Sequence, residues 1–330
     1  MKRVAIVGLG KMGLLHASLL SVLPEVELVA ICEQGALIRR FGRKVLGGSK
    51  MVGRVAELSG LGLDAIFVTT PPSSHFGVVE AILSANLAPN IFVEKPLAAS
   101  GAESEELCRL IEKQASGTNM VGYNRRFAVT FGKAKEILDE GSLGDVHSFQ
   151  AHAYSSDFLG ATSSSNARSR GSVLRDLGCH AVDLAMWFFG ALQLETVEAG
   201  AMVEKGSVDS VSFRAATRDG LAGEFKNSWC MANYRLPEIG LTASGSKGIM
   251  RVNDDDVELK LKTGNEHLWR RHDLNDDAAF FLGGTDYFRE DEAFVRALMN
   301  GSGVEPSFRS AVAVDQLVDQ VEERARGHGR

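Results

Sequence analysis

The first twenty residues carry a glycine pattern that restricts the fold more than any other stretch of the chain. An apolar run, Val4–Val7, predicts a buried parallel strand that stops at Gly8. Gly8, Gly10 and Gly13 complete the spacing G-x-G-x-x-G, and the apolar-rich residues 14–20 predict a helix. A strand, a glycine turn and a helix in this order are typical of a dinucleotide-binding βαβ unit. The alternative is a glycine turn in an α/β protein that binds no nucleotide.

Each glycine of this pattern has a physical role in nucleotide binding. Gly8 would allow a tight turn, Gly10 would let the backbone approach a pyrophosphate, and Gly13 would let the helix pack close to the strand. Lys11 and Met12 belong to the same predicted site, because a helix N-terminus offers free N–H groups and a positive dipole end to phosphates.

An acidic residue after the next strand strengthens this interpretation. Glu33 ends the apolar run that starts at Val26 and follows Gly13 by twenty positions. At that distance a carboxylate accepts hydrogen bonds from the adenosine ribose hydroxyls. Glu33 would repel a 2′-phosphate, so NAD is the expected cofactor. The next predicted helix, residues 37–46, carries four basic residues that leave NADP as the alternative: Arg39, Arg40, Arg43 and Lys44.

Composition excludes several classes of protein. With 330 residues the chain can form two domains, and its formal net charge of −6 without a long basic run argues against nucleic acid as a partner. The four cysteines show no C-x-x-C pairing, which argues against a disulfide framework and a cysteine-bound zinc ion, and no metal site is expected. No apolar run reaches membrane-spanning length, so we expect no membrane partner and a cytoplasmic protein.

Strands and helices alternate through the first third of the chain. Further buried strands are predicted at residues 64–70, 91–93 and 119–123, with helices at 76–85 and 102–114 between them. This alternation predicts an α/β Rossmann fold with a doubly wound parallel sheet over residues 1–122.

The second part of the chain has a different pattern. Helices are predicted at residues 131–140, 173–189, 287–299 and 310–326. A strand is predicted at 146–153, and β-like runs follow at 196–203, 208–217, 221–229, 238–243 and 248–252. Residues 123–330 are therefore predicted to form an α+β domain with a predominantly antiparallel open sheet. An exposed face of that sheet would suit a homodimer or homotetramer.

Several short motifs resemble the glucose–fructose oxidoreductase / inositol dehydrogenase family, also called Gfo/Idh/MocA. They are the glycine pattern, Thr70-Pro71 with His75, Glu94-Lys95-Pro96, Gly122-Tyr-Asn-Arg-Arg-Phe127 and Asp176-x-x-x-His180-x-x-Asp183. The resemblance implies that Thr70, Pro71, His75 and Glu94 lie at the cofactor, whereas Glu94 by itself would have a structural role and fix Lys95 or its loop. It also implies that Lys95 lies beside the nicotinamide and the substrate, and that the Lys95–Pro96 peptide is cis. One departure is Arg170-Gly171-Ser172, where the family often has a glycine-rich triplet.

The catalytic candidates are Lys95, Asp176 and His180. His180 is a candidate base because imidazole titrates near neutral pH. Asp176 lies four residues earlier and would set the His180 tautomer or bind a substrate hydroxyl. Lys95 would stabilise a developing alkoxide and relay a proton, or act as the base itself if desolvation lowers its pKa. The assignment of the base stays open between Lys95 and His180.

The same three residues are candidate substrate contacts, together with five others. These are Tyr123, Arg125, Arg126, Arg168 and Arg170. For Arg125 and Arg126 we expect one substrate contact and one structural ion pair. Arg168 and Arg170 are either solvated loop charges or ligands for the carboxylate or phosphate of an acidic sugar.

The residues and the resemblance together predict an NAD(P)-dependent oxidoreductase. It would transfer a hydride between the nicotinamide and a secondary alcohol or ketone of a cyclic polyol: a sugar, a nucleotide sugar or inositol. Two alternatives stay open. One is a reductase of a non-sugar carbonyl or imine, and the other is a non-catalytic dinucleotide sensor on the same fold.

Overall fold

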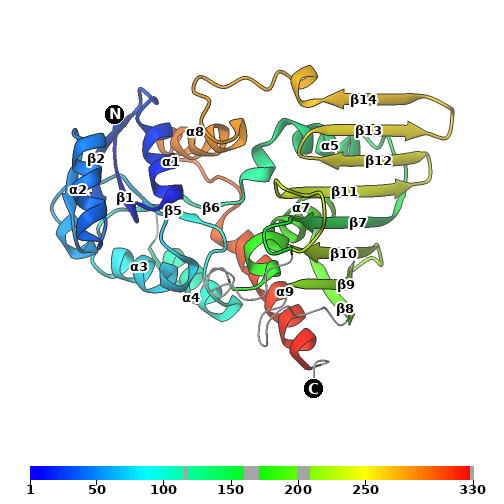
Figure 1. Ribbon diagram of the computed structural model, residues 1–330, viewed down its shortest axis with the longest axis horizontal. Coiled ribbons are helices and arrows are strands. Elements are labelled where there is room, and N and C mark those ends of the chain that lie inside the picture. The colour runs from blue at the N-terminus through cyan, green and yellow to red at the C-terminus, as the bar shows by residue number, and fades with distance from the viewer. Residues whose placement is uncertain (115–116, 160–170, 199–208, 328–330) are drawn as a thin grey trace. The chain divides into compact units, whose positions relative to one another are not determined.

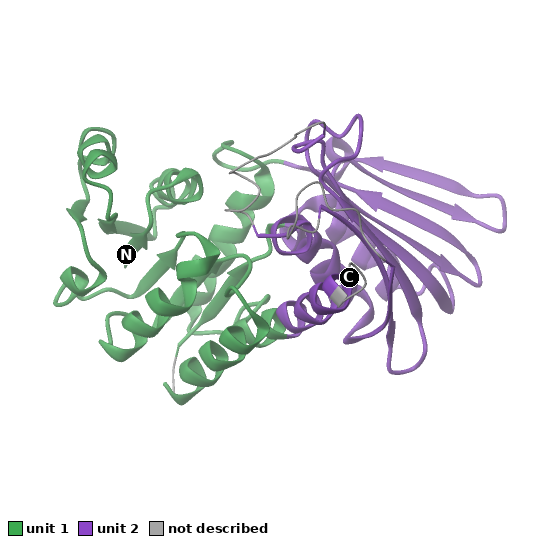
Figure 2. Ribbon diagram, turned by 60° about the horizontal axis from the view of Figure 1, so that its bottom comes forward, with its two compact units in different colours: residues 1–124, 277–312 green, residues 125–276, 313–330 purple. Residues whose placement is uncertain are grey.

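The computed structural model describes residues 1–114, 117–159, 171–198 and 209–327. The chain divides into two compact units (Figure 2). Unit 1 contains Met1–Asn124 and Asp277–Val312, and unit 2 contains Arg125–Asp276 and Ala313–Arg330. The sequence assigned residues 277–312 to the second domain, whereas by packing they group with the first unit.

Unit 1 is built on a six-stranded sheet in the order β3-β2-β1-β4-β5-β6, in which every neighbouring pair is parallel. The strands are β1 (Lys2–Val7), β2 (Val26–Cys32), β3 (Lys50–Val52), β4 (Ala65–Val68), β5 (Asn90–Glu94) and β6 (Asn119–Gly122). All four residues of β4 are buried, as expected for a parallel strand covered on both faces. The predicted Rossmann fold is confirmed.

Helices cover both faces of this sheet (Figure 1). They are α1 (Lys11–Leu20), α2 (Ala36–Val45), α3 (Pro72–Ser84), α4 (Gly101–Lys113) and α8 (Thr285–Asn300). Helices α1 and α8 pack together on one face, and α3 and α4 pack together on the other. The strand order reverses between β1 and β4, and the edge of the sheet at the carboxyl ends of these strands is where α/β proteins bind their ligands.

Unit 2 contains an eight-stranded sheet in the order β14-β13-β12-β11-β7-β10-β9-β8. Its strands are β7 (Val146–Tyr154), β8 (Leu192–Glu198), β9 (Ser210–Thr217), β10 (Ala222–Ser228), β11 (Glu238–Gly245), β12 (Gly248–Asn253), β13 (Asp256–Leu261) and β14 (Glu266–Arg270). The β7–β10 pair is parallel, and the other neighbouring pairs are antiparallel. The predicted, predominantly antiparallel sheet is confirmed.

The two faces of this sheet differ in chemistry. One face packs against α5 (Val129–Asp139) and α7 (Cys179–Phe189), and there Phe149, Phe213 and Phe225 are buried. The opposite face carries charged cross-strand pairs: Arg251 faces Glu258, and Arg214 faces Glu224. The last helix, α9 (Phe308–Gly327), begins in unit 1 and continues into unit 2.

Several elements differ from the sequence prediction. The sequence did not predict β13 or the edge strand β14, because charged residues hide the alternation of buried Val257 and Leu259 in β13 and no residue of β14 is buried. The helix expected over residues 173–189 opens with a π-helical turn, Leu174–Gly178, before α7 begins. Short 3-10 turns lie at Val55–Leu58, Asn124–Phe127 and Arg271–Leu274. Within the described residues, no helix is both long and apolar enough to cross a membrane.

Candidate active site

The glycine loop of unit 1 is held between the carboxyl ends of three strands. The N–H of Gly8 donates to the carbonyl of Cys32 at the end of β2, at 2.8 Å. Thr69, directly after β4, donates its N–H to the Val7 carbonyl at 2.9 Å and its hydroxyl to the Gly8 carbonyl at 2.7 Å. The loop therefore lies at the point where the strand order reverses.

Backbone geometry gives the three glycines different roles. Gly8 has φ +100°, a conformation that L side chains rarely adopt. A Cβ on Gly13 would lie 1.9 Å from the Gly8 carbonyl oxygen, so α1 can pack this closely only with glycine there. A Cβ on Gly10 would meet nothing within 4 Å, and Gly10 is exposed. Gly8 and Gly13 shape the loop, and Gly10 leaves open space in front of it.

The start of α1 is suited to an anion. Its N-cap residue is Gly10, no side chain caps the helix, and the first turn contains no acidic residue. Lys11 is exposed and Met12 is half-buried at this end. The N–H groups and the positive dipole end are therefore available to phosphate oxygens.

Glu33 is fixed beside this loop. One carboxylate oxygen accepts the N–H of Leu9 at 2.9 Å, and the other accepts the N–H of Gly35 at 2.6 Å. Each carboxylate oxygen can accept a second hydrogen bond, so the group can still receive ribose hydroxyls. The Arg39 guanidinium donates to the carbonyls of Glu33 and Gln34 at 2.6 and 2.7 Å, which holds the turn after β2.

The segment after β4 connects to the segment after β5 through His75. Its ring nitrogens lie 2.7 Å from the Thr70 carbonyl and 2.9 Å from the Pro96 carbonyl. The ring is fully buried, and burial outweighs the two carbonyls and lowers its pKa. His75 thus fixes the two loops from behind, and its predicted contact with the cofactor stays a prediction. The hydroxyl of Thr70 is buried without a hydrogen-bond partner in the described residues, while Pro71 is exposed.

The motif Glu94-Lys95-Pro96 ends β5 at the same edge of the sheet. The Lys95–Pro96 peptide is cis, as the resemblance implied. Glu94 is buried and accepts the backbone N–H of Lys95 at 3.1 Å, while Lys95 itself is half-buried. Tyr123 follows β6 and is fully buried. Unit 1 therefore gathers the residues predicted at its strand ends along one edge.

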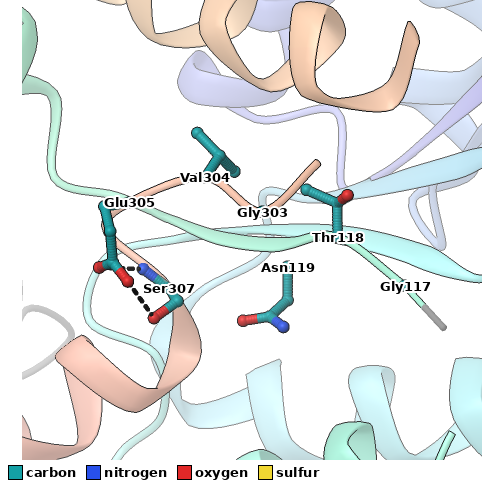
Figure 3. Close-up of a pocket in the computed structure, with 7 residues that line it drawn as sticks. All are labelled: Gly117, Thr118, Asn119, Gly303, Val304, Glu305 and Ser307. Carbon is teal, nitrogen blue, oxygen red and sulfur yellow. Dashed lines mark hydrogen bonds between the residues drawn. The ribbon is translucent and has the colours of Figure 1, made fainter. Parts of the chain in front are cut away.

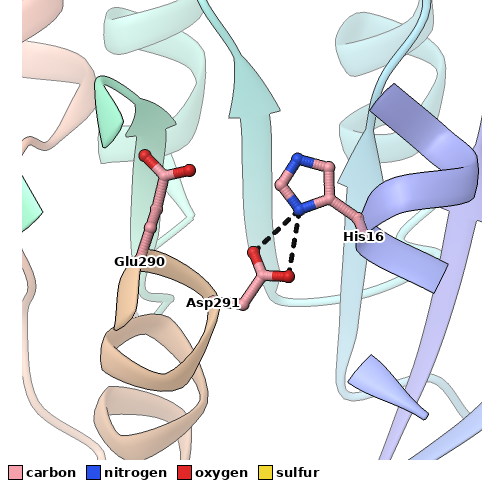
Figure 4. A group of neighbouring side chains, drawn as sticks. All are labelled: His16, Glu290 and Asp291. Carbon is pink, nitrogen blue, oxygen red and sulfur yellow. Dashed lines mark hydrogen bonds and ion pairs between the residues drawn. The ribbon is translucent and has the colours of Figure 1, made fainter. Parts of the chain in front are cut away.

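Behind this edge lies a cluster that the sequence did not reveal. His16 on α1 contacts Asp291 on α8, and Glu290 lies beside them (Figure 4). The other ring nitrogen of His16 contacts Glu94. Ligand-type atoms of His16, Glu290 and Asp291 lie within 4.8 Å of one another, the spacing of a candidate metal site among the described residues. Both ring nitrogens of His16 are already hydrogen-bonded to carboxylates, so a cation could bind His16 only by displacing a carboxylate from one ring nitrogen.

Unit 2 contributes a second group of predicted residues. Asp176 lies in the π-helical turn and is half-buried, and His180 lies in the first turn of α7 with 8% of its surface exposed. Isolated π-turns occur frequently at functional sites. A Cβ on Gly178, between the two residues, would lie 2.8 Å from the amide oxygen of Asn227 on β10, so the turn packs tightly on the sheet.

Both arginines after β6 form ion pairs. Arg126 binds Asp183 on α7 with two hydrogen bonds of 2.9 and 2.6 Å, and this pair is almost fully buried. Arg125 pairs with Asp254 at 2.7 Å, and about a fifth of each side chain is exposed. The expected structural ion pair is present, and a substrate contact by either arginine stays a prediction. Arg168 and Arg170 lie outside the described residues.

A separate cavity of about 230 Å³ lies in unit 1, lined by residues 117–119, 303–305 and 307 (Figure 3). Glu305 closes one side, where its carboxylate accepts the N–H and the hydroxyl of Ser307, each at 2.9 Å. Asn119 begins β6, so the cavity is at the amino end of that strand. The predicted site lies at the carboxyl ends of the strands, and this cavity is not part of it.

Two family models match the chain. Residues 2–123 match the model for an oxidoreductase family with an NAD-binding Rossmann fold, and residues 131–251 match the GFO/IDH/MocA C-terminal domain. Together the matches cover most of both units.

Similar proteins include several cyclitol and sugar dehydrogenases. An inositol 2-dehydrogenase of Rhizobium meliloti (strain 1021) is 27% identical over 330 residues, which cover 96% of this chain and 94% of the relative. A scyllo-inositol 2-dehydrogenase (NAD(+)) of Bacillus subtilis (strain 168) is 28% identical over 68% of this chain and 67% of its own. Levoglucosan dehydrogenase, solved with NADH and levoglucosan, shares the fold: its TM-score is 0.86 at 18% identity, with 99% of this chain and 97% of that chain covered.

Proposed function

This chain belongs to the Gfo/Idh/MocA family of oxidoreductases, and from that premise we propose that it is an NAD(P)-dependent dehydrogenase of a cyclic polyol. The reaction is hydride transfer between the nicotinamide and a secondary alcohol or ketone of the ring. The observation that supports it best is the shared edge of unit 1. There the glycine loop, Glu33 and Lys95 all follow the carboxyl ends of parallel strands.

The glycine loop and Glu33 are the residues that would bind the dinucleotide. The open space at Gly10 and the uncapped start of α1 fit a pyrophosphate. The carboxylate of Glu33, held by Leu9 and Gly35, fits two ribose hydroxyls and disfavours a 2′-phosphate. We therefore propose NAD over NADP. When bound, the nicotinamide supplies the hydride acceptor.

Lys95, Asp176 and His180 are the proposed acid–base residues. The Lys95 ammonium would stabilise negative charge on the reacting oxygen. Lys95 or His180 would take the hydroxyl proton, and Asp176 would orient the imidazole or hold a neighbouring hydroxyl. Tyr123, Arg125 and Arg126 remain proposed substrate contacts, and Arg168 and Arg170 remain proposed ligands for an acidic group.

The substrate class follows from the relatives. These relatives are named for inositol and levoglucosan, which are rings that carry several hydroxyl groups. A polyol ring offers both the secondary alcohol that loses the hydride and further hydroxyls for hydrogen bonding. We propose a cyclitol or a sugar as the substrate of this chain.

The test is a substrate panel with matched variants. The purified protein is incubated with NAD or NADP and with cyclitols, aldoses, uronic acids and UDP-sugars, and nicotinamide absorbance is followed. We expect reduction of NAD with one group of polyols, and its loss in Lys95→Ala and His180→Ala while dinucleotide binding persists. Lys113→Ala, a substitution on α4, is the control. Undiminished turnover in both site variants would refute the proposed roles.

The open face of the unit 2 sheet is the proposed contact between copies of the chain. Positive and negative side chains alternate across its neighbouring strands, as in the pairs Arg251 with Glu258 and Arg214 with Glu224. This pattern suits an interface in which the same face of two copies makes contact about a two-fold axis. We propose a homodimer or homotetramer, which light scattering would measure.

A cytoplasmic location is also proposed, supported by four cysteines that form no disulfide.

A further inference from the structure

His16 connects the glycine-loop helix to the motif that contains Lys95. Its Nδ1 lies 2.8 and 3.0 Å from the two carboxylate oxygens of Asp291, and its Nε2 lies 2.9 Å from Oε1 of Glu94. His16 and Asp291 are fully buried, and Glu94 is nearly so. The other oxygen of Glu94 accepts the backbone N–H of Lys95. A continuous path of hydrogen bonds therefore runs from α8 through α1 to Lys95.

Aromatic rings exclude water from this path. The ring centroid of His16 lies 5.7 Å from that of Phe67 on β4 and 5.2 Å from that of Phe92 on β5. Phe294 on α8 packs against both phenylalanines, at 5.3 and 5.7 Å. In such surroundings each ionised group needs a partner of opposite charge, because solvent cannot supply one.

The geometry favours the charged form of His16. A neutral imidazole donates one hydrogen bond, whereas a ring with an ionised carboxylate at each nitrogen can donate to both only when it is protonated. Burial alone would lower the pKa of His16, but Asp291 and Glu94 raise it well above its ordinary value. The carboxyl groups on both sides therefore favour an imidazolium at His16, although burial also raises the pKa of Asp291.

Glu290 completes the cluster as a neutral acid. Neither of its carboxylate oxygens has a hydrogen-bond partner in the described residues, and the residue is fully buried. Burial and the neighbouring charge of Glu94 raise its pKa well above its ordinary value. The charged and titratable groups that face His16 are thus Glu94 from β5 and Glu290 and Asp291 from α8.

We propose that His16 is a positioning residue for Lys95 and acts through Glu94. Its ring donates to one carboxylate oxygen of Glu94 and fixes it, so the other oxygen can hold the Lys95 backbone in one place. This rests on the proposed function, in which Lys95 touches the substrate. Removing the ring of His16 would let the Glu94 carboxylate rotate, and Lys95 would lose its fixed position without any change in the glycine loop.

The kinetic test uses His16→Gln, Glu94→Gln and the double variant. Glutamine can donate toward one carboxylate but cannot donate toward both. We expect kcat to fall about 10- to 100-fold in His16→Gln, with KM for NAD changed less than about threefold. If His16 acts through Glu94, the double variant will be no slower than Glu94→Gln. The proposal would be overturned if the kcat losses of the two single variants multiplied in the double variant, or if KM rose while kcat stayed unchanged. His152→Gln removes another His–carboxylate pair, on β7, and is the control.

Two measurements need no turnover, so failure of the proposed function can be told apart from failure of this inference. Nitrogen-15 NMR should show the ring of His16 protonated at pH 8, with its signal assigned by His16→Gln. After reductive methylation with a carbon-13 label, the Lys95 signal, assigned by Lys95→Arg, should shift in His16→Gln and not in His152→Gln. A neutral His16 or an unmoved Lys95 signal would overturn the proposal. So would a zinc-dependent rise in melting temperature that disappears in His16→Gln, because it would reveal a metal site.

Discussion

The carboxylate of Glu33 accepts the backbone N–H of Leu9 at 2.9 Å, and this bond joins the end of β2 to the glycine loop. A second bond, from Gly35, fixes the other oxygen. The negative charge is therefore held in one place beside the phosphate-binding loop. This places the residue that would select between NAD and NADP on a rigid support.

The first prediction separates the charge of Glu33 from its hydrogen bonds. In Glu33→Gln the amide oxygen can still accept the N–H of Leu9, but the charge is gone. We expect the preference for NAD over NADP, measured as a ratio of Kd values by calorimetry, to fall about tenfold, which corresponds to about 1.4 kcal/mol. Glu27→Gln on the same strand is the control, since Glu27 pairs with Arg3 at the surface. An unchanged ratio would mean that Glu33 does not select the cofactor.

The second prediction uses the different surroundings of two glycines. Gly13→Ala would force a Cβ to within 1.9 Å of the Gly8 carbonyl oxygen, so we expect a loss of at least about 3 kcal/mol in the free energy of unfolding. Gly10→Ala adds a methyl group to open space, so stability should change by less than about 0.5 kcal/mol. NAD affinity should nevertheless fall in Gly10→Ala, because that space is where the pyrophosphate would lie. Urea unfolding and NAD titration of both variants check this, and full NAD affinity in Gly10→Ala would contradict it.

The Rossmann half of the fold was predictable because its signals are local. Buried parallel strands appear as continuous apolar runs, as in Ala65–Val68, and the glycine spacing marks the turn after β1. The same locality placed Glu33 and Lys95 at strand ends. The polar strands β13 and β14 at one end of the second sheet were missed, because their charged side chains obscure the apolar alternation.

The buried cluster could not be found in the same way. His16 stands in an apolar helix, and its partner Asp291 is 275 positions away in the sequence. No pattern in a single sequence pairs two residues so distant. The π-helical turn was missed for a related reason: it depends on how Gly178 packs against Asn227 on another strand. Local propensity predicts a helix in this segment, but it does not predict that the first turn is π-helical.

The third prediction compares the ion pairs of Arg126 and Arg125 in unit 2. The side chains of Arg126 and Asp183 are 9% and 1% exposed, so Arg126→Ala removes the guanidinium that faces a buried carboxylate. We expect the free energy of unfolding to fall by about 3 to 5 kcal/mol. Arg125→Ala breaks a pair that is more exposed, and a loss of about 1 kcal/mol is expected. Urea unfolding measures both, and equal losses would contradict the difference in burial.

The fourth prediction concerns the pH dependence of stability and follows from Glu290 and His16. The pKa of each is raised in the folded chain, so the folded state keeps a proton that the unfolded state releases. The stabilisation is complete below the unfolded pKa, about 4.3 for Glu and about 6.5 for His, and is lost as pH rises toward the folded values. Within that window each group lowers the free energy of unfolding by about 1.4 kcal/mol per pH unit.

Glu290→Gln tests this sign directly. The amide cannot ionise, so the linked proton of Glu290 disappears, and the variant should lose less stability than the unsubstituted chain as pH rises from 5 to 9. Because neutral Gln also avoids the energetic cost of keeping an acid protonated, the variant should be the more stable of the two at pH 9. Glu292→Gln on the same helix is the control, since Glu292 pairs with Arg296 at the surface. Urea unfolding across this pH range measures the slope. If the free energy of unfolding had the same slope against pH in Glu290→Gln and in the unsubstituted chain, Glu290 would ionise at its ordinary pKa. The cluster would then carry a different charge from the one its geometry implies.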